Sequence, residues 1–107
     1  MPQERRSSER RSVSEEGMLS EGMHFRLCRV RDLSLGGAFL EVGWSILSRD
    51  HPVDLALTLL SDHQPKPRVY HLSAEVTRIA TDGTAIRFKS LDQTTSNALF
   101  GHLKRSV

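Results

Sequence analysis

Residues 69–88 read VYHLSAEVTRIATDGTAIRF, and their pattern indicates how the chain folds. Apolar side chains recur at every second position on both sides of Asp82-Gly83, which is the pattern of two half-buried strands. An Asp-Gly pair between such runs favours a tight hairpin with a type I′ turn, whose two central residues have positive φ angles. We therefore predict an antiparallel hairpin whose inward-facing residues are Tyr70, Leu72, Ala74, Val76, Ile86 and Phe88.

Similar alternation precedes this hairpin at several places. Residues 53–59 (VDLALTL) give the clearest inward set, and residues 38–42 give a shorter one. In residues 23–27 the alternation places Met23, Phe25 and Leu27 inward. The phase then slips to Cys28 and Val30, which predicts a β-bulge. Residues 61–67 (SDHQPKP) are polar, contain two prolines and predict a loop.

The period changes near the C-terminus. Asp92 is suited to cap a helix, and the residues after it follow helical spacing. We predict a terminal helix over about residues 92–104. Several short strands followed by one helix predict an all-β fold, a six-stranded antiparallel β-barrel with a C-terminal α-helix packed on it.

The charge is unevenly distributed along the 107 residues, whose formal net charge is +2. Four arginines fall within the first eleven residues, and residues 1–12 hold no apolar side chain after Met1. Such a segment has nothing to bury, so we predict a flexible arginine-rich arm over 1–12 and a folded domain over 13–107. The arm favours an anionic partner. A single cysteine and the lack of a long apolar run favour a cytoplasmic protein without a membrane segment.

Two short motifs carry the functional interpretation. The first is Arg6-Ser-Ser-Glu-Arg10, preceded by Arg5, and the second is Asp32-Leu-Ser34-Leu-Gly36-Gly37. Each motif alone is ordinary tail or turn chemistry. In this order and ahead of a series of strands they resemble the PilZ domain family, whose signature is RxxxR followed by [D/N]xSxxG. The resemblance covers nearly the whole chain and implies a Greek-key barrel that binds the second messenger cyclic di-GMP.

The resemblance assigns Arg6, Arg10, Asp32, Ser34 and Gly37 to ligand binding, and Gly36 is added because a second glycine beside Gly37 allows close backbone approach. Guanidinium groups bind phosphate oxygens bidentately and match the N7 and O6 acceptors of guanine. Asp32 offers an acceptor to guanine N1–H, Ser34 a hydroxyl, and the glycines close backbone approach or unusual φ angles. In this family an arginine in the place of Arg5 accompanies two intercalated ligand molecules, so we expect that stoichiometry here.

Arg78 is a further candidate for the site. It is in phase with Val76 and is therefore predicted to end an inward-facing row at the rim of the barrel. A residue near this place often contacts guanine in the PilZ family, whereas a solvated surface arginine is an equally good interpretation. The chain departs from the family at Ala85, where glycine is common, and we expect no aromatic side chain near Arg78.

Other functions remain open. The five histidines are scattered, so we expect no enzyme, metal site or cofactor, and Cys28 fits a small buried residue. A basic arm on a barrel also describes single-stranded nucleic-acid-binding proteins, but Phe25, Tyr70 and Phe88 are predicted to face inward rather than to form stacking platforms. A PilZ-like protein-interaction adaptor without a ligand is the other alternative. For a cyclic di-GMP receptor, the signal must pass to an unidentified effector protein.

Overall fold

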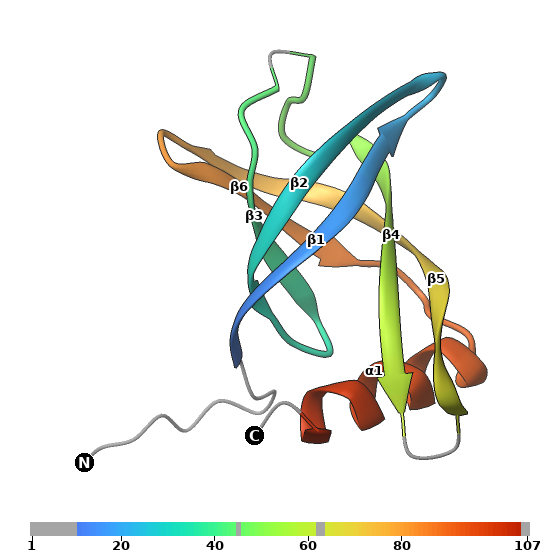
Figure 1. Cartoon of the computed structure of the whole chain (residues 1–107). Coiled ribbons are helices and arrows are strands. Elements are labelled where there is room, and N and C mark those ends of the chain that lie inside the picture. Colours follow the sequence, from blue (N-terminus) through green and yellow to red (C-terminus); the bar gives the residue numbers. More distant parts are fainter. Residues whose placement is uncertain (1–10, 45, 62–63, 106–107) are drawn as a thin grey trace.

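The computed structural model describes residues 11–44, 46–61 and 64–105 and has the predicted architecture (Figure 1). The strands close into an antiparallel barrel in the order β1-β2-β3-β6-β5-β4. The Greek-key topology is confirmed, because β3 lies beside β6 while the chain continues from β3 to β4 through a long connection. The elements are β1 (Arg11–Glu21), β2 (His24–Leu33), β3 (Gly37–Glu41), β4 (Pro52–Ser61), β5 (Gln64–Ala80), β6 (Gly83–Phe88) and α1 (Gln93–Arg105).

The predicted alternation on β4, β5 and β6 is confirmed. Val53, Leu55, Leu57 and Leu59 are at most 6% exposed. Val53 lies opposite Ala74 and Leu55 opposite Leu72 on the neighbouring strand β5. Ile86 and Phe88 are buried in the same core, with Tyr70 packed at its margin. These strands follow the period-two pattern because one face is fully enclosed by the barrel and the other meets solvent.

The prediction for residues 23–27 is wrong. Met23, Phe25 and Leu27 are 88%, 67% and 65% exposed. The β1–β2 register is continuous through this region, so no bulge separates Leu27 from Cys28; the bulge on β2 lies between Val30 and Asp32. Because Cys28 and Val30 are buried, Phe25 and Leu27 lie on the opposite, outer face of the same continuous strand, and Met23 lies in the turn before it. The tip of the β1–β2 hairpin also projects beyond the barrel (Figure 1).

The predicted loop at 61–67 is also wrong, because β5 begins at Gln64. Pro65 and Pro67 belong to this strand. They are compatible with it because the first half of β5 pairs with β4 alone, and β6 pairs only from Ala74 onward. Proline is tolerated where one edge of a strand has no ladder partner.

The hairpin at Asp82-Gly83 is confirmed, but its turn is not type I′. Ala80 pairs with Gly83, so Thr81 and Asp82 form the turn, and neither has a positive φ angle. Glycine is needed at position 83 for space instead. A Cβ there would lie 2.5 Å from Cε2 of Phe39 and would overlap the Leu40 carbonyl oxygen.

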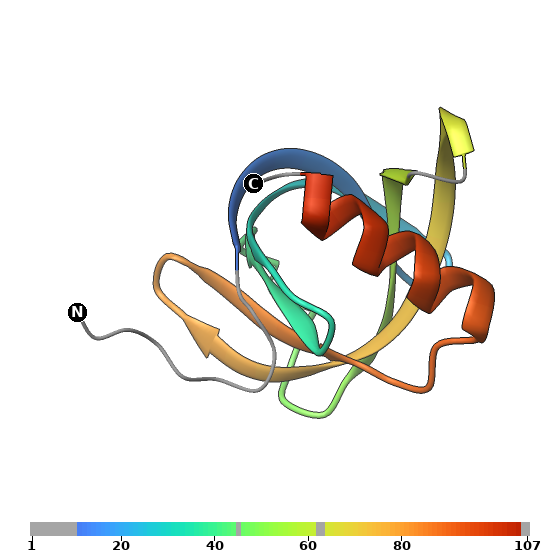
Figure 2. The same ribbon diagram turned by 90° about the horizontal axis from the view of Figure 1, so that it is seen from below.

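Helix α1 begins within one residue of its predicted start and lies across one end of the barrel beside β4 (Figure 2). Ala98, Leu99 and Leu103 are buried in the common core. His102 Nδ1 accepts a hydrogen bond from the Leu60 amide at 3.1 Å, so the Nε2 proton is donated to Glu15 at 2.7 Å. The helix is thereby joined to both β4 and β1. Within the described residues, no helix is long and apolar enough to cross a membrane.

Asp92 caps helix α1 as predicted. Its Oδ1 accepts a hydrogen bond from the Thr95 amide at 2.7 Å, and this bond lowers the pKa of the Asp92 carboxyl. We expect Asp92→Ala to lower the urea midpoint of unfolding, because one amide at the helix start loses its acceptor. Thr94→Ala, one position into the exposed first turn, is the control. Urea unfolding checks both variants, and equal midpoints would contradict the role given to Asp92.

Candidate functional site

A row of four residues crosses the outer face of the barrel. Asp32 on β2 lies opposite Phe39 on β3, Phe39 lies opposite Ala85 on β6, and Ala85 lies opposite Arg78 on β5. Residues directly opposite in antiparallel strands point to the same side of the sheet. Leu33, Leu40 and Ile86, which alternate with them, are buried in the core. Asp32, Phe39, Ala85 and Arg78 therefore form one outer row.

The structure corrects the sequence-based placement of two of these residues. Asp32 lies within β2 rather than in a loop. Arg78 is exposed on the outer face and does not end an inward row, because a bulge between Val76 and Arg78 inserts one residue and reverses the alternation. The bulge brings Arg78 into line with Asp32, so the correction places both candidates on one surface.

Phe39 was not predicted from the sequence to belong to the site. Its ring is only 6% exposed, although it points to the outer face. The guanidinium carbon of Arg31 lies 4.2 Å from the ring centroid, and that of Arg78 lies 5.8 Å from it. Arg78 therefore does have an aromatic neighbour, contrary to expectation. The two residues are 39 positions apart in sequence and meet only because β6 lies between their strands.

Ser34 organises the turn between β2 and β3. Its Oγ accepts hydrogen bonds from the amides of Gly36 and Gly37, both at 3.2 Å, and its own amide donates to the Gly37 carbonyl at 2.9 Å. The residue is 7% exposed. With these hydrogen bonds Ser34 closes the turn, which is the ordinary role of such a motif. Gly36 and Gly37 do not have positive φ angles, so the prediction of unusual backbone angles is wrong.

Gly37 is needed because β3 approaches β6 closely. A Cβ at this position would overlap the carbonyl oxygen of Ile86 and lie 3.2 Å from the Cα of Arg87. A Cβ on Gly36 would meet only Ser34 Oγ, at 4.0 Å. The two adjacent glycines therefore differ in function. Gly37 allows the strands to pair, whereas Gly36 leaves open space above the turn.

A cavity of about 330 Å³ lies between the Ser34 turn and the outer row, with Gly37, Phe39, Thr77, Arg78 and Arg87 among its lining residues. Arg87 forms an ion pair with Glu75. Within the described part of the chain, Arg78 has no ion-pair partner and its recorded contact is with Phe39. The cavity thus combines a cation, an aromatic edge and open backbone above a turn.

The N-terminal arginines Arg5, Arg6 and Arg10 lie outside the described residues. Strand β1 begins at Arg11, so the last two residues of the predicted 1–12 arm belong to the barrel. Arg11 pairs with Leu33, and Ser12 pairs with Asp32. The chain that follows the RxxxR motif therefore enters the barrel directly beside the second motif.

Groups suited to other chemistry are not assembled in the described residues. No cluster of three or more His, Cys, Asp or Glu side chains in this part of the chain is arranged to hold a metal ion. Burial raises the pKa of the Cys28 thiol to about 11, so this thiol stays protonated near neutral pH and is a poor nucleophile. His51 pairs with Glu21 and His71 pairs with Asp54.

Comparison with solved structures finds the same fold in proteins of low sequence identity. The PilZ domain of CeSA from a cellulose-synthesizing bacterium has a TM-score of 0.72 and 17% identity, over 92% of this chain and 99% of that one. The PilZ domain of YcgR from Escherichia coli with c-di-GMP has a TM-score of 0.67 and 18% identity, over 96% and 95%. PlzA from Borreliella burgdorferi, in complex with c-di-GMP, has a TM-score of 0.62 and 14% identity, over 92% of this chain and 40% of that one.

No curated protein sequence matches the chain. The sequence pattern of the PilZ domain, however, matches residues 4–105, from the arginine motif to the end of α1. The barrel order, the terminal helix and the two motifs agree with this match. The chain belongs to the PilZ domain family.

Proposed function

We propose that this protein is a receptor for cyclic di-GMP (c-di-GMP). The observation that carries the proposal is the convergence of three features on one face: the outer row, the Ser34 turn and the strand that follows the arginine motif. Two PilZ proteins of the same fold, YcgR and PlzA, are described with c-di-GMP, which supports the same ligand here.

The chemistry of the ligand suits this face. Each molecule presents two phosphates and two guanines. Arg6 and Arg10 would bind phosphate oxygens or the N7 and O6 acceptors of guanine, and Arg78 would stack on a base or contact it from the opposite edge of the cavity. Asp32 would accept hydrogen bonds from a guanine N1–H. Ser34 would act by fixing the turn on which the ligand rests, because its hydroxyl is already engaged there.

The signal would be transmitted by the arm. Ligand binding would bring several clustered arginines onto the barrel and create a composite surface of arm, ligand and outer row. A partner that recognises this surface is coupled to the messenger by linkage, without a hinge. Part of the binding energy would be spent on ordering the arm, since each fixed residue costs about 1–2 kcal/mol of backbone entropy. We place this receptor in the cytoplasm, acting on an effector protein that the structure does not identify.

Calorimetric titration of the full chain with c-di-GMP and with a single-stranded oligonucleotide separates the candidate functions. We expect c-di-GMP to bind with two molecules per chain, because Arg5 precedes the RxxxR pair. The nucleic-acid alternative has one observation in its favour, since Phe25 is exposed rather than buried. Tighter binding of the oligonucleotide would support that alternative. Binding of neither ligand would favour a ligand-independent interaction adaptor.

A further inference from the structure

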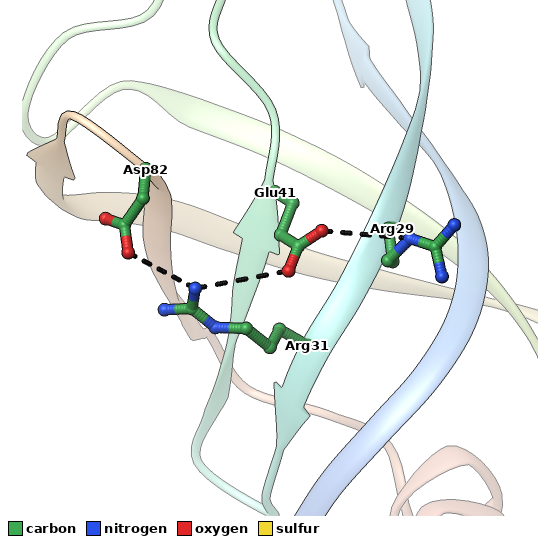
Figure 3. A network of polar contacts seen from close by, with 4 residues as sticks. All are labelled: Arg29, Arg31, Glu41 and Asp82. Carbon is green, nitrogen blue, oxygen red and sulfur yellow. Dashed lines mark hydrogen bonds and ion pairs between the residues drawn. The ribbon is translucent and has the colours of Figure 1, made fainter.

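Two arginines and two carboxylates form a network on the outer face of the barrel (Figure 3), and Arg31 of this network contacts the ring of Phe39. Arg31 Nη1 lies 3.2 Å from Asp82 Oδ2 and 4.0 Å from Glu41 Oε2. Arg29 Nε lies 3.7 Å from Glu41 Oε1. The carboxylate of Asp82 comes from the β5–β6 turn and that of Glu41 from β3. The network therefore fixes Arg31 of β2 across two neighbouring elements, and its formal charge is zero.

The guanidinium group of Arg31 is held at one of its nitrogens, Nη1, and along one face of its plane. Both carboxylates contact Nη1, while the guanidinium carbon lies 4.2 Å from the centroid of the Phe39 ring. Within the described residues, the edge formed by Nε and Nη2 has no recorded hydrogen-bond partner, and the side chain is 41% exposed. The β2 bulge between Val30 and Asp32 places Arg31 on the outer face. The Nε and Nη2 donors of Arg31 therefore form a planar edge beside the outer row, and the orientation of this edge is fixed.

The charge balance indicates what this edge would bind. A phosphate is attracted by net positive charge, and here Glu41 and Asp82 offset the charges of Arg29 and Arg31. The uncharged acceptors of guanine, N7 and O6, match a guanidinium edge in a bidentate arrangement that does not require excess charge. Adenine carries an amino donor in place of O6 and cannot accept the second hydrogen bond. The site therefore fits a guanine better than a phosphate or an adenine.

We propose that Arg31 is a guanine-selecting residue of the ligand site. Its Nε and Nη2 donate to N7 and O6 of one guanine, while Phe39, Glu41 and Asp82 hold the guanidinium plane in place. This inference rests on the proposed function. It adds a residue that belongs to neither sequence motif, and it assigns that residue to base identity rather than to phosphate affinity.

The test compares Arg31→Gln with Arg29→Gln. The two variants lose the same charge from the same strand, and both remove an ion pair with Glu41. Arg29, however, lies opposite Glu41, away from the outer row. Calorimetry would measure c-di-GMP binding at several salt concentrations, and competition would measure cyclic di-AMP. Arg31→Lys, which keeps the charge without the planar edge, is the third variant.

We expect Arg31→Gln and Arg31→Lys each to weaken c-di-GMP binding by about tenfold or more, with an unchanged salt slope and a smaller preference over cyclic di-AMP. Arg29→Gln should stay within about twofold of the wild type. Equal affinities of the Arg31 and Arg29 variants for c-di-GMP would overturn the inference. So would an equal loss for both dinucleotides, or full rescue by lysine. Failure of the wild type to bind c-di-GMP would instead reject the proposed function.

Discussion

Replacing Arg6 and Arg10 together by alanine is expected to weaken c-di-GMP binding by at least about 100-fold. Each arginine would supply charge-assisted hydrogen bonds, and the loss of one costs roughly 1.5–3 kcal/mol, so two losses amount to about 3–6 kcal/mol. Without these two arginines, the bound ligand would also no longer attract the arm to the barrel. The effect should therefore exceed that of any single substitution in the outer row.

The control is the pair Lys66→Ala and Arg68→Ala, which removes the same formal charge. Both residues are exposed on the first half of β5, at the opposite end of this strand from Arg78 (Figure 1). Calorimetry at one salt concentration compares the two double variants. We expect the control to bind within about threefold of the wild type, since distant exposed charges are screened. A similar loss in both variants would mean that only net charge matters, and it would contradict a specific role of the arginine motif.

Gly37→Ala is expected to cause the largest loss of stability among single substitutions at the site. The added Cβ would overlap the Ile86 carbonyl oxygen, which belongs to the backbone of β6 and cannot rotate away. The β3–β6 ladder would have to separate, at a cost of about 2–3 kcal/mol or more. For a domain of this size, 1 kcal/mol corresponds to roughly 4–8 °C in Tm, so we expect a fall of at least about 8 °C.

Gly36→Ala is the matched control for this prediction. The position is adjacent, its φ angle is not positive, and the nearest atom to a new Cβ is Ser34 Oγ at 4.0 Å. We expect its Tm to stay within about 3 °C of the wild type, since a surface substitution without a clash changes stability by roughly 0.5 kcal/mol or less. Thermal unfolding followed by circular dichroism measures both. Two variants with the same Tm would show that the close approach of β3 to β6 is not what requires glycine.

The sequence predicted the barrel where burial and alternation coincide. Residues 53–59 have one face in the core along their whole length, so the period of two identifies that face correctly. The same reasoning failed at Phe25 and Leu27, because these residues alternate with the buried Cys28 and Val30 and so lie on the outer face, and at Met23, which lies in the turn before β2. It failed again at Arg78, where a bulge reverses the phase. A bulge leaves little trace in the pattern of residue types, so such errors are expected in strands of this kind.

The candidate site was predicted in part for a related reason. Asp32, Ser34 and Gly37 belong to a contiguous motif that is visible in one stretch of sequence. Phe39 and Arg31 act through contacts between strands, and the Asp82 that fixes Arg31 comes from a turn 51 positions away. Cross-strand register decides those contacts, and register depends on the bulges that the alternation did not locate. Arg5, Arg6 and Arg10 stay predictions, since they lie outside the described residues.

Amide hydrogen exchange of the full chain, with and without c-di-GMP, tests whether the ligand is held between the N-terminal arm and the outer face around Asp32, Ser34 and Arg78. The account predicts that residues 4–10 exchange rapidly without ligand and gain protection with it, together with the 34–37 turn. Strand β4 should change little, because it contributes nothing to the outer row. An arm that is already protected without ligand, or binding that protects β4 and leaves the arm unchanged, would contradict the account.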